Sequence, residues 1–251
     1  MARSIAAESD RPQNAGHADV KLNLEDLAGR TFMLLWFTVA VAGQTMSLIK
    51  LLSHGDGSPT WMLNVVHSVL LILFSTVAVA LTVLRRPTKI VASGLEPRIS
   101  AILGTYSVLT ISLLPTVNPG AALEAVAVVI MVIGAGLSVY CLIWLGQSYS
   151  IMAAARKLVT GGPYRFVRHP LYAAELLTIF GIALANFSLP AVLIFAATAA
   201  FQLRRSVNEE RVLRAAFPEY EEYARAVPRI IPRLPWSRRP AIPAELLPEA
   251  H

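Results

Sequence analysis

The sequence contains a single cysteine, Cys141, among its 251 residues. One thiol cannot form an internal disulfide and cannot by itself make a cysteine-based metal site, so we predict neither, and no metal site. Charged residues are scarce as well, at 15% of the chain against 55% hydrophobic residues. A mean hydropathy of +0.56 is too high for a typical soluble domain. The sequence therefore predicts an integral membrane protein.

Several sequence signals are missing. Residues 1–29 are polar and of mixed charge, with no basic start followed by an apolar core and a cleavage site, so we expect no signal peptide. There is no internal repeat and no glycine fingerprint of the dinucleotide-binding type, which argues against a nicotinamide-dependent reductase. The net charge of +6 would suggest nucleic acid for a soluble protein, but in a membrane protein it is better explained by topology, and we predict no nucleic-acid partner.

Six apolar segments are present, at residues 31–52, 61–84, 99–114, 121–145, 171–187 and 190–203. At about 1.5 Å per residue, the last two barely cross a hydrocarbon core of about 30 Å, so we expect them to form a helical hairpin packed within the bundle. The small residues Gly134, Ala135 and Gly136 suit close helix packing. The predicted fold is an all-α polytopic membrane bundle of about six helices, followed by a cytoplasmic C-terminal helix.

The basic residues favour one orientation. With six crossings, Lys50 alone among the 22 Lys and Arg residues falls on the side of the loops near residues 53–60, 116–120 and 186–189, which leaves 21 on the other side. The positive-inside rule places that basic side, with both termini, in the cytoplasm.

The stretch 157–172, KLVTGGPYRFVRHPLY, is the densest run of specific chemistry. Gly161 and Gly162 tolerate positive φ, and Pro163 lacks an N–H donor, so a turn with exposed backbone N–H groups is expected. Pro170 suits the first turn of the apolar helix that follows. The loop therefore ends on a helix N-terminus, which attracts anions.

This segment extends into LVTGGPYRFVRHPLYAAE, and after one apolar hairpin comes NEERVLRAAFPEYEEYARAVPRIIP. Together they resemble the isoprenylcysteine carboxyl methyltransferase family and its phospholipid methyltransferase relatives, over roughly residues 146–232. The resemblance implies an all-helical integral membrane enzyme that uses S-adenosylmethionine, held in a pocket facing the cytoplasm. The domain organisation is then a tail at 1–30, four membrane helices at 31–145, a methyltransferase-like region at 146–232 and a Pro-rich tail at 233–251. Residues 204–225 form an amphipathic helix that could continue the sixth span.

The resemblance also implies roles for individual residues. The cofactor contacts fall on Leu158, Val159, Gly162, Tyr164, His169, Pro170, Leu171, Tyr172 and Glu209. Arg205 matches a family arginine beside the methyl-accepting substrate and is the predicted catalytic residue, and Glu175, one turn into the fifth span, is assigned to the substrate side. Relatives often place a glycine after the second tyrosine, where this chain has Ala173.

The expected partners are membrane lipids and a lipophilic or lipid-linked substrate. A carboxylate acceptor is already ionised at neutral pH and needs no general base, so Arg205 would pair with it and align it. A phospholipid amine would have to lose a proton, and His169 or a glutamate would have to accept it. A membrane reductase and a non-catalytic scaffold remain as further alternatives.

Simpler explanations exist for the same residues. Arg205 and Glu209 are four apart and could form an intrahelical salt bridge. His169 could cap the next helix. Arg156, Lys157, Arg165 and Arg168 could be topology or lipid-headgroup charges.

Overall fold

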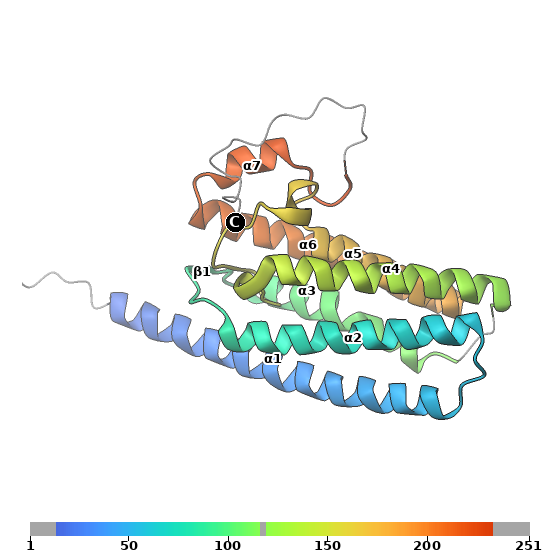
Figure 1. The fold of residues 1–251 in the computed structure, drawn as a ribbon. Coiled ribbons are helices and arrows are strands. Elements are labelled where there is room, and N and C mark those ends of the chain that lie inside the picture. Colours follow the sequence, from blue (N-terminus) through green and yellow to red (C-terminus); the bar gives the residue numbers. More distant parts are fainter. Residues whose placement is uncertain (1–13, 116–118, 233–251) are drawn as a thin grey trace, which may run out of the picture.

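The structure is a computed structural model that describes residues 14–115 and 119–232. The predicted Pro-rich tail at 233–251 therefore lies outside the described residues. Four helices precede the loop at residues 157–169: α1 (Asn14–Ser53), α2 (Pro59–Leu84), α3 (Leu95–Tyr106) and α4 (Ala121–Leu145). Three follow it: α5 (Pro170–Asn186), α6 (Leu189–Ala216) and α7 (Tyr220–Ala226). The helices α1, α2, α4, α5 and α6 form an elongated bundle, and α7 lies outside it, above α6 in this view (Figure 1).

Short elements connect the helices. There are three 3₁₀ turns among the described residues, η1 (Ser107–Leu113), η2 (Gly146–Ser148) and η3 (Gly162–Arg165). The strands β1 (Ile90–Val91) and β2 (Ala154–Ala155) pair antiparallel, with Ile90 opposite Ala155. This ribbon joins the α2–α3 connection to the segment that leads into the loop at residues 157–169.

Glycines allow α4 and α5 to lie in close contact. A Cβ at Gly134 would lie 2.5 Å from Thr178 Oγ1, and a Cβ at Gly181 would lie 2.6 Å from Met131 Cγ, so neither position has room for a side chain. The predicted role of the small-residue patch in close helix packing is thus confirmed at Gly134. In the same way Gly104 of α3 approaches the backbone of α6 at Gln202, 3.4 Å from its would-be Cβ.

Three helical segments among the described residues are long and apolar enough to cross a membrane: Leu27–Ser53, Pro59–Leu84 and Ala121–Ser148. The helix Pro170–Asn186 is apolar but shorter. The prediction of an all-α membrane protein is confirmed by these helices and by the near absence of sheet among the described residues. The count of six crossings stays a prediction.

Two elements differ from the expected boundaries. Helix α1 begins at Asn14, so residues 14–30, expected within a polar tail, are helical, and no proline interrupts this stretch. The expected third span at 99–114 divides into α3 and the 3₁₀ turn η1. Val108, Thr110 and Ile111 are β-branched and weaken α-helix there, and Pro115 disfavours helix at the residue before it.

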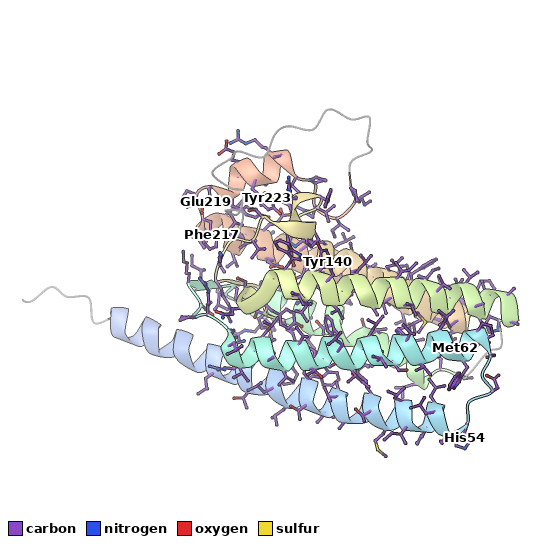
Figure 2. The ribbon with its side chains drawn as sticks, in the orientation of Figure 1. His54, Met62, Tyr140, Phe217, Glu219 and Tyr223 are labelled. Atoms are coloured by element: carbon purple, nitrogen blue, oxygen red, sulfur yellow. The ribbon has the colours of Figure 1, made fainter. Side chains whose placement is uncertain are left out.

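The C-terminal helices follow the sequence prediction more closely. Helix α6 runs without a break from Leu189 to Ala216, so the amphipathic stretch continues the sixth apolar segment as expected. Pro218 separates it from α7. His54 and Met62 lie at one end of the bundle, and Phe217, Glu219 and Tyr223 lie at the other (Figure 2). The candidate site is at this second end.

Candidate active site

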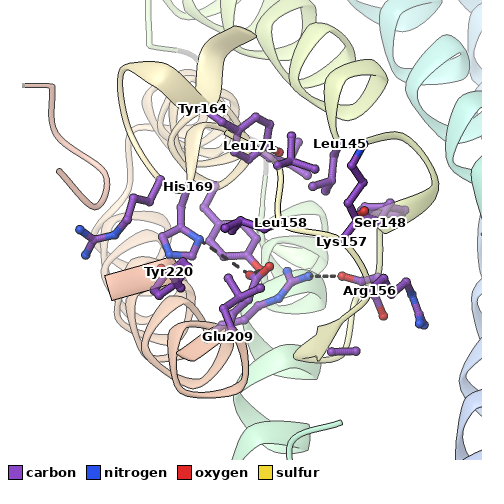
Figure 3. A pocket seen from close by; sticks show the side chains of 18 of the residues that line it. Leu145, Ser148, Arg156, Lys157, Leu158, Tyr164, His169, Leu171, Glu209 and Tyr220 are labelled. Carbon is purple, nitrogen blue, oxygen red and sulfur yellow. Dashed lines mark hydrogen bonds and ion pairs between the residues drawn. The ribbon is translucent and has the colours of Figure 1, made fainter. Parts of the chain in front are cut away.

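A cavity lies where the segment between α4 and α5 meets α6 and α7 (Figure 3). The predicted site residues on its wall are Leu158, Val159, Tyr164, His169, Leu171, Tyr172, Arg205 and Glu209. Gly162, Pro170 and Glu175 are not among the lining residues. The structure therefore brings most of the predicted residues around one space, from elements that are up to about fifty positions apart in sequence.

Gly162 and Pro170 determine the shape of the loop although they do not line the cavity. Gly162 has φ +55°, and a Cβ there would lie 2.3 Å from Trp144 Cδ2, so both the backbone and the space require glycine. Pro170 occupies the first turn of α5, as the sequence predicted. His169 is the N-cap residue of that helix, but its side chain makes no capping hydrogen bond, so capping does not explain the imidazole.

Tyr172 is the centre of the polar contacts in the cavity. Its hydroxyl donates to Glu209 Oε2 at 2.5 Å, and the His169 ring stacks on its ring with centroids 5.3 Å apart. The guanidinium carbon of Arg205 lies 4.6 Å from the centroid of the Tyr172 ring, a cation–π distance. One aromatic ring thus holds the predicted cofactor residues and the predicted catalytic residue together.

Arg205 is almost fully buried, with 3% of its surface exposed. Its Nη1 donates to Thr105 Oγ1 at 3.2 Å and its Nη2 donates to the Ser150 carbonyl at 3.3 Å, whereas its Nε has no partner among the described residues. The guanidinium is therefore held by α3 and by the segment after α4 rather than by an intrahelical bridge to Glu209. A buried donor without a partner is costly unless a ligand satisfies it.

Glu210 was missed by the sequence reasoning as a separate site residue. Its carboxylate is 0% exposed and accepts from Arg168 Nε at 3.0 Å, from Arg229 Nε at 2.9 Å and from Arg229 Nη2 at 3.0 Å. His169 Nε2 lies 3.3 Å from Glu210 Oε1. Burial opposes ionisation, but the hydrogen bonds from His169, Arg229 and Arg168 outweigh it and hold the pKa of Glu210 well below its ordinary value.

Arg168 is correspondingly a structural residue, and its interpretation as a headgroup or topology charge is corrected. It also donates to the carbonyls of Ala224, at 2.6 Å, and Val227, at 2.7 Å. The backbone N–H groups of Arg168 and His169 donate to the carbonyls of Pro228, at 2.8 Å, and Arg229, at 2.9 Å. These contacts join the chain after α7 to Arg168 and His169, which with Pro170 form an Arg-His-Pro (RHP) motif. The Glu-Glu pair was the only sequence signal that could have pointed to this cluster.

Glu175 lies away from the cavity wall. Its Oε2 accepts a hydrogen bond from Gln202 Nε2 at 2.7 Å, and this hydrogen bond joins α5 to α6. Gln202 is itself buried, and its Oε1 has no partner among the described residues. Glu175 is thus held by α6 and does not line this cavity, and its assignment to the substrate side stays a prediction.

Residues 122–220 match the family model described as phospholipid methyltransferase. The matched region runs from the start of α4 through the RHP motif and the Glu-Glu pair to the first residue of α7. The recognition made from the motif is therefore confirmed, and this family implies a membrane methyltransferase.

Two curated relatives are similar over a shorter stretch. The cobalt-zinc-cadmium resistance protein CzcN of Cupriavidus metallidurans is 44% identical over 78 residues, which are 31% of this chain and 36% of that protein. The nickel-cobalt-cadmium resistance protein NccN of Alcaligenes xylosoxydans xylosoxydans is 37% identical over 79 residues, 31% of this chain and 37% of that protein. The chain thus matches just over a third of the length of each. Among the described residues, no cluster of three or more His, Cys, Asp or Glu could hold a metal ion.

Proposed function

We propose that this protein is an integral membrane methyltransferase that uses S-adenosylmethionine and methylates a carboxylate of a lipophilic substrate. The observation that supports this most is the buried guanidinium of Arg205, which lies on the cavity wall with one N–H unsatisfied. A fixed, desolvated cation with a free donor suits an anionic acceptor, because the planar guanidinium binds a carboxylate through two hydrogen bonds.

The cavity residues fit the cofactor chemically. When bound, S-adenosylmethionine supplies an electrophilic methyl group on a positively charged sulfonium. Glu209 would accept hydrogen bonds from the ribose or the ammonium of the cofactor. Leu158, Val159 and Leu171 would pack against the apolar parts of the cofactor. The hydroxyl of Tyr164 is buried without a partner among the described residues and would be satisfied by the ligand.

The cavity has a volume of about 50 Å³, whereas ligand pockets usually enclose about 300–1,000 Å³. Residues 157–159 of its wall have no regular secondary structure, and Lys157 is exposed. We therefore propose that this segment moves outward to admit the cofactor. The wall on the other side is anchored by Glu210 and stays in place.

The roles of the protein groups follow for a carboxylate acceptor. Arg205 would replace the water lost by the acceptor and orient it, and no protein group would need to take a proton because the acceptor is already ionised. Tyr172, stacked against both Arg205 and His169, would keep the guanidinium at a constant distance from the cofactor residues. Catalysis would consist of positioning and electrostatic stabilisation.

A phospholipid amine is the second candidate acceptor, and the description of the matching family favours it. An ammonium must lose a proton before it can attack. Glu209 is 26% exposed and lies in the cavity beside Tyr172, so its carboxylate is the group placed to accept that proton. In this case Arg205 would instead bind the lipid phosphate.

We further propose six membrane crossings with the active site and both termini in the cytoplasm. Reporter fusions after Arg86, Ser58 and Phe217 test this. Cytoplasmic signals are expected at Arg86 and Phe217, because the basic residues lie on the side of the membrane where these two positions fall. An extracytoplasmic signal is expected at Ser58. An extracytoplasmic signal at Phe217 would contradict an even number of crossings.

The cofactor assignment is tested by calorimetry on the purified protein. Micromolar binding of S-adenosylmethionine and of its demethylated product is expected, and Glu209→Ala should weaken it at least tenfold, about 1.4 kcal/mol, because the variant removes the cavity carboxylate. Glu219→Ala, at an exposed position outside the cavity, is the matched control and should bind like the parent. Equal affinities in the parent and both variants would show that the pocket is elsewhere.

A further inference from the structure

The loop at residues 157–169 packs against the side of α4. The backbone of Gly162 lies so close to the ring of Trp144 that a Cβ at Gly162 would come within 2.3 Å of it. Trp144 and Tyr140 are near the end of a helix that is long and apolar enough to cross a membrane, and their rings are 42% and 49% exposed. In Figure 2 the loop lies above the labelled Tyr140. Exposed Trp and Tyr side chains at the end of a spanning helix mark the membrane–water interface, so the loop lies at that depth.

The chain after α7 is hydrogen-bonded to this loop. The backbone N–H of His169 donates to the carbonyl of Arg229 at 2.9 Å. The hydroxyl of Tyr223, on α7, donates to the carbonyl of Tyr164 at 2.6 Å. Residues 227–232 are therefore held beside the loop, and the two segments belong to one surface of the protein.

Two large apolar side chains are exposed on this surface. Among the described residues of 146–169 and 217–232, the exposed large apolar side chains are those of Phe166, at 58%, and Ile231, at 81%. Such side chains are unfavourable in water and favourable among the outer parts of lipid acyl chains. Because Phe166 belongs to the loop that packs on Trp144, the boundary of the bilayer is within its reach.

The charge of the same two segments is positive. Residues 157–169 and 227–232 contain four Lys and Arg residues and no Asp or Glu. Two of the four are paired with Glu210, whereas Lys157 and Arg165 are exposed. An arginine beside an apolar side chain that enters the bilayer can extend its guanidinium to the lipid phosphates. Positive charge at this depth is complementary to acidic phospholipids.

We propose that Arg165, Phe166 and Ile231 form a docking surface for a bilayer that contains acidic phospholipids. Phe166 and Ile231 insert among the acyl chains, and Arg165 binds a lipid phosphate. This contact goes beyond the proposed methyl transfer, because it concerns how the loop is held at the membrane. Tyr164, on the wall of the candidate active site, is in the same turn, so the bilayer would hold that part of the wall in place.

Fluorescence quenching tests the depth of this surface. The full-length protein carries Cys141→Ala and one new cysteine, from Phe166→Cys, Ile231→Cys or Glu219→Cys, labelled with an NBD fluorophore in nanodiscs of phosphatidylcholine and phosphatidylglycerol. All three positions are exposed, so the labels should not affect folding. Nitroxide-labelled lipid should quench the fluorophore at positions 166 and 231. Aqueous iodide should quench it at position 219, the matched control.

A comparison of two nitroxide-labelled lipids tests the head group. From quenching at position 166, the binding constant of phosphatidylglycerol relative to phosphatidylcholine should be about fivefold, the effect of one basic side chain near an acidic bilayer. Arg165→Gln should bring this ratio close to one. Arg86→Gln is the matched control, because it removes an exposed arginine from the α2–α3 connection, and it should leave the ratio unchanged.

Three results would overturn the proposal. Iodide quenching at positions 166 and 231 equal to that at position 219 would place the surface in water. Protection from iodide without quenching by lipid nitroxides would indicate a protein partner such as a second copy of this chain. An unchanged ratio in Arg165→Gln, or an equal loss in Arg86→Gln, would show that Arg165 does not bind the acidic lipid.

Discussion

Glu210→Ala is expected to lower the free energy of unfolding by about 3 kcal/mol, because removing one partner from a buried ion cluster leaves uncompensated charge. Arg168 would remain with 10% of its side chain exposed and without its carboxylate. Arg229 is 40% exposed and can turn toward water, which keeps the loss at the lower end of the range for buried pairs. Unfolding by urea in detergent micelles measures the effect.

The neighbouring Glu209 provides the control. It is 26% exposed and accepts one described hydrogen bond, from the buried hydroxyl of Tyr172, so Glu209→Ala should lower stability by only about 1 kcal/mol. Glu210→Gln keeps the shape of the side chain and one acceptor oxygen. Its loss of stability should therefore lie between the losses in Glu209→Ala and Glu210→Ala. Equal losses at Glu209 and Glu210 would contradict the assignment of Glu210 as the centre of the cluster.

The cluster also predicts a dependence on pH. The pKa of Glu210 is held below its ordinary value of 4.5, so its contribution to stability is complete above pH 4.5 and is lost progressively as the pH falls further. The stability difference between the parent and Glu210→Gln should therefore narrow between pH 5 and pH 3. A constant difference over this range would show that Glu210 is not selectively stabilised as a carboxylate.

Arg205→Lys should reduce methyl transfer about 100-fold, as the loss of one preorganised donor does in other enzymes. The ammonium of lysine cannot bind a carboxylate through two parallel hydrogen bonds or stack in the same way on Tyr172. Transfer of labelled methyl groups from S-adenosylmethionine to an extracted lipid fraction measures the rate. Cofactor affinity should change less than twofold, and Arg204→Lys, next in sequence but 48% exposed, should keep the parental rate.

The pH profile of the same reaction separates the two acceptors. A carboxylate with a pKa near 4 is ionised throughout, so the rate should be flat from about pH 6 to 9. An amine acceptor would give a rate that rises with pH as the ammonium loses its proton. A rising profile together with a mild effect of Arg205→Lys would reject the carboxylate and favour the phospholipid amine.

The sequence predicted the elements of the site well because its signals were local. Pro170 at a helix start and the Gly162 turn are each determined by a few neighbouring residues, and the structure places both as expected. The motif then identified the cavity residues, although they come from α5, α6 and the loop before α5. These predictions did not depend on the direction in which each side chain points.

The missed features depend on side-chain direction over long separations. Adjacent residues on a helix point about 100° apart, so the sequence could not tell which of Glu209 and Glu210 faces the protein interior. It also could not show that Arg229, some twenty residues further on, folds back onto Glu210. A second cavity, lined by α1, α3 and the β1–β2 ribbon, is a similar case, because no local pattern indicates the pairing of the two strands.

The unbroken helix α6 has a consequence for how the enzyme would respond to its bilayer. Arg205 and Glu209 are one turn apart on the same rigid rod, about 6 Å along its axis. In a thinner bilayer, the hydrophobic mismatch of a long helix would be relieved by tilting of that helix. Tilting would change the depth of both residues in the membrane together while leaving the spacing between them constant, so bilayer thickness would alter which part of a lipid reaches Arg205 without altering the distance over which the methyl group is transferred.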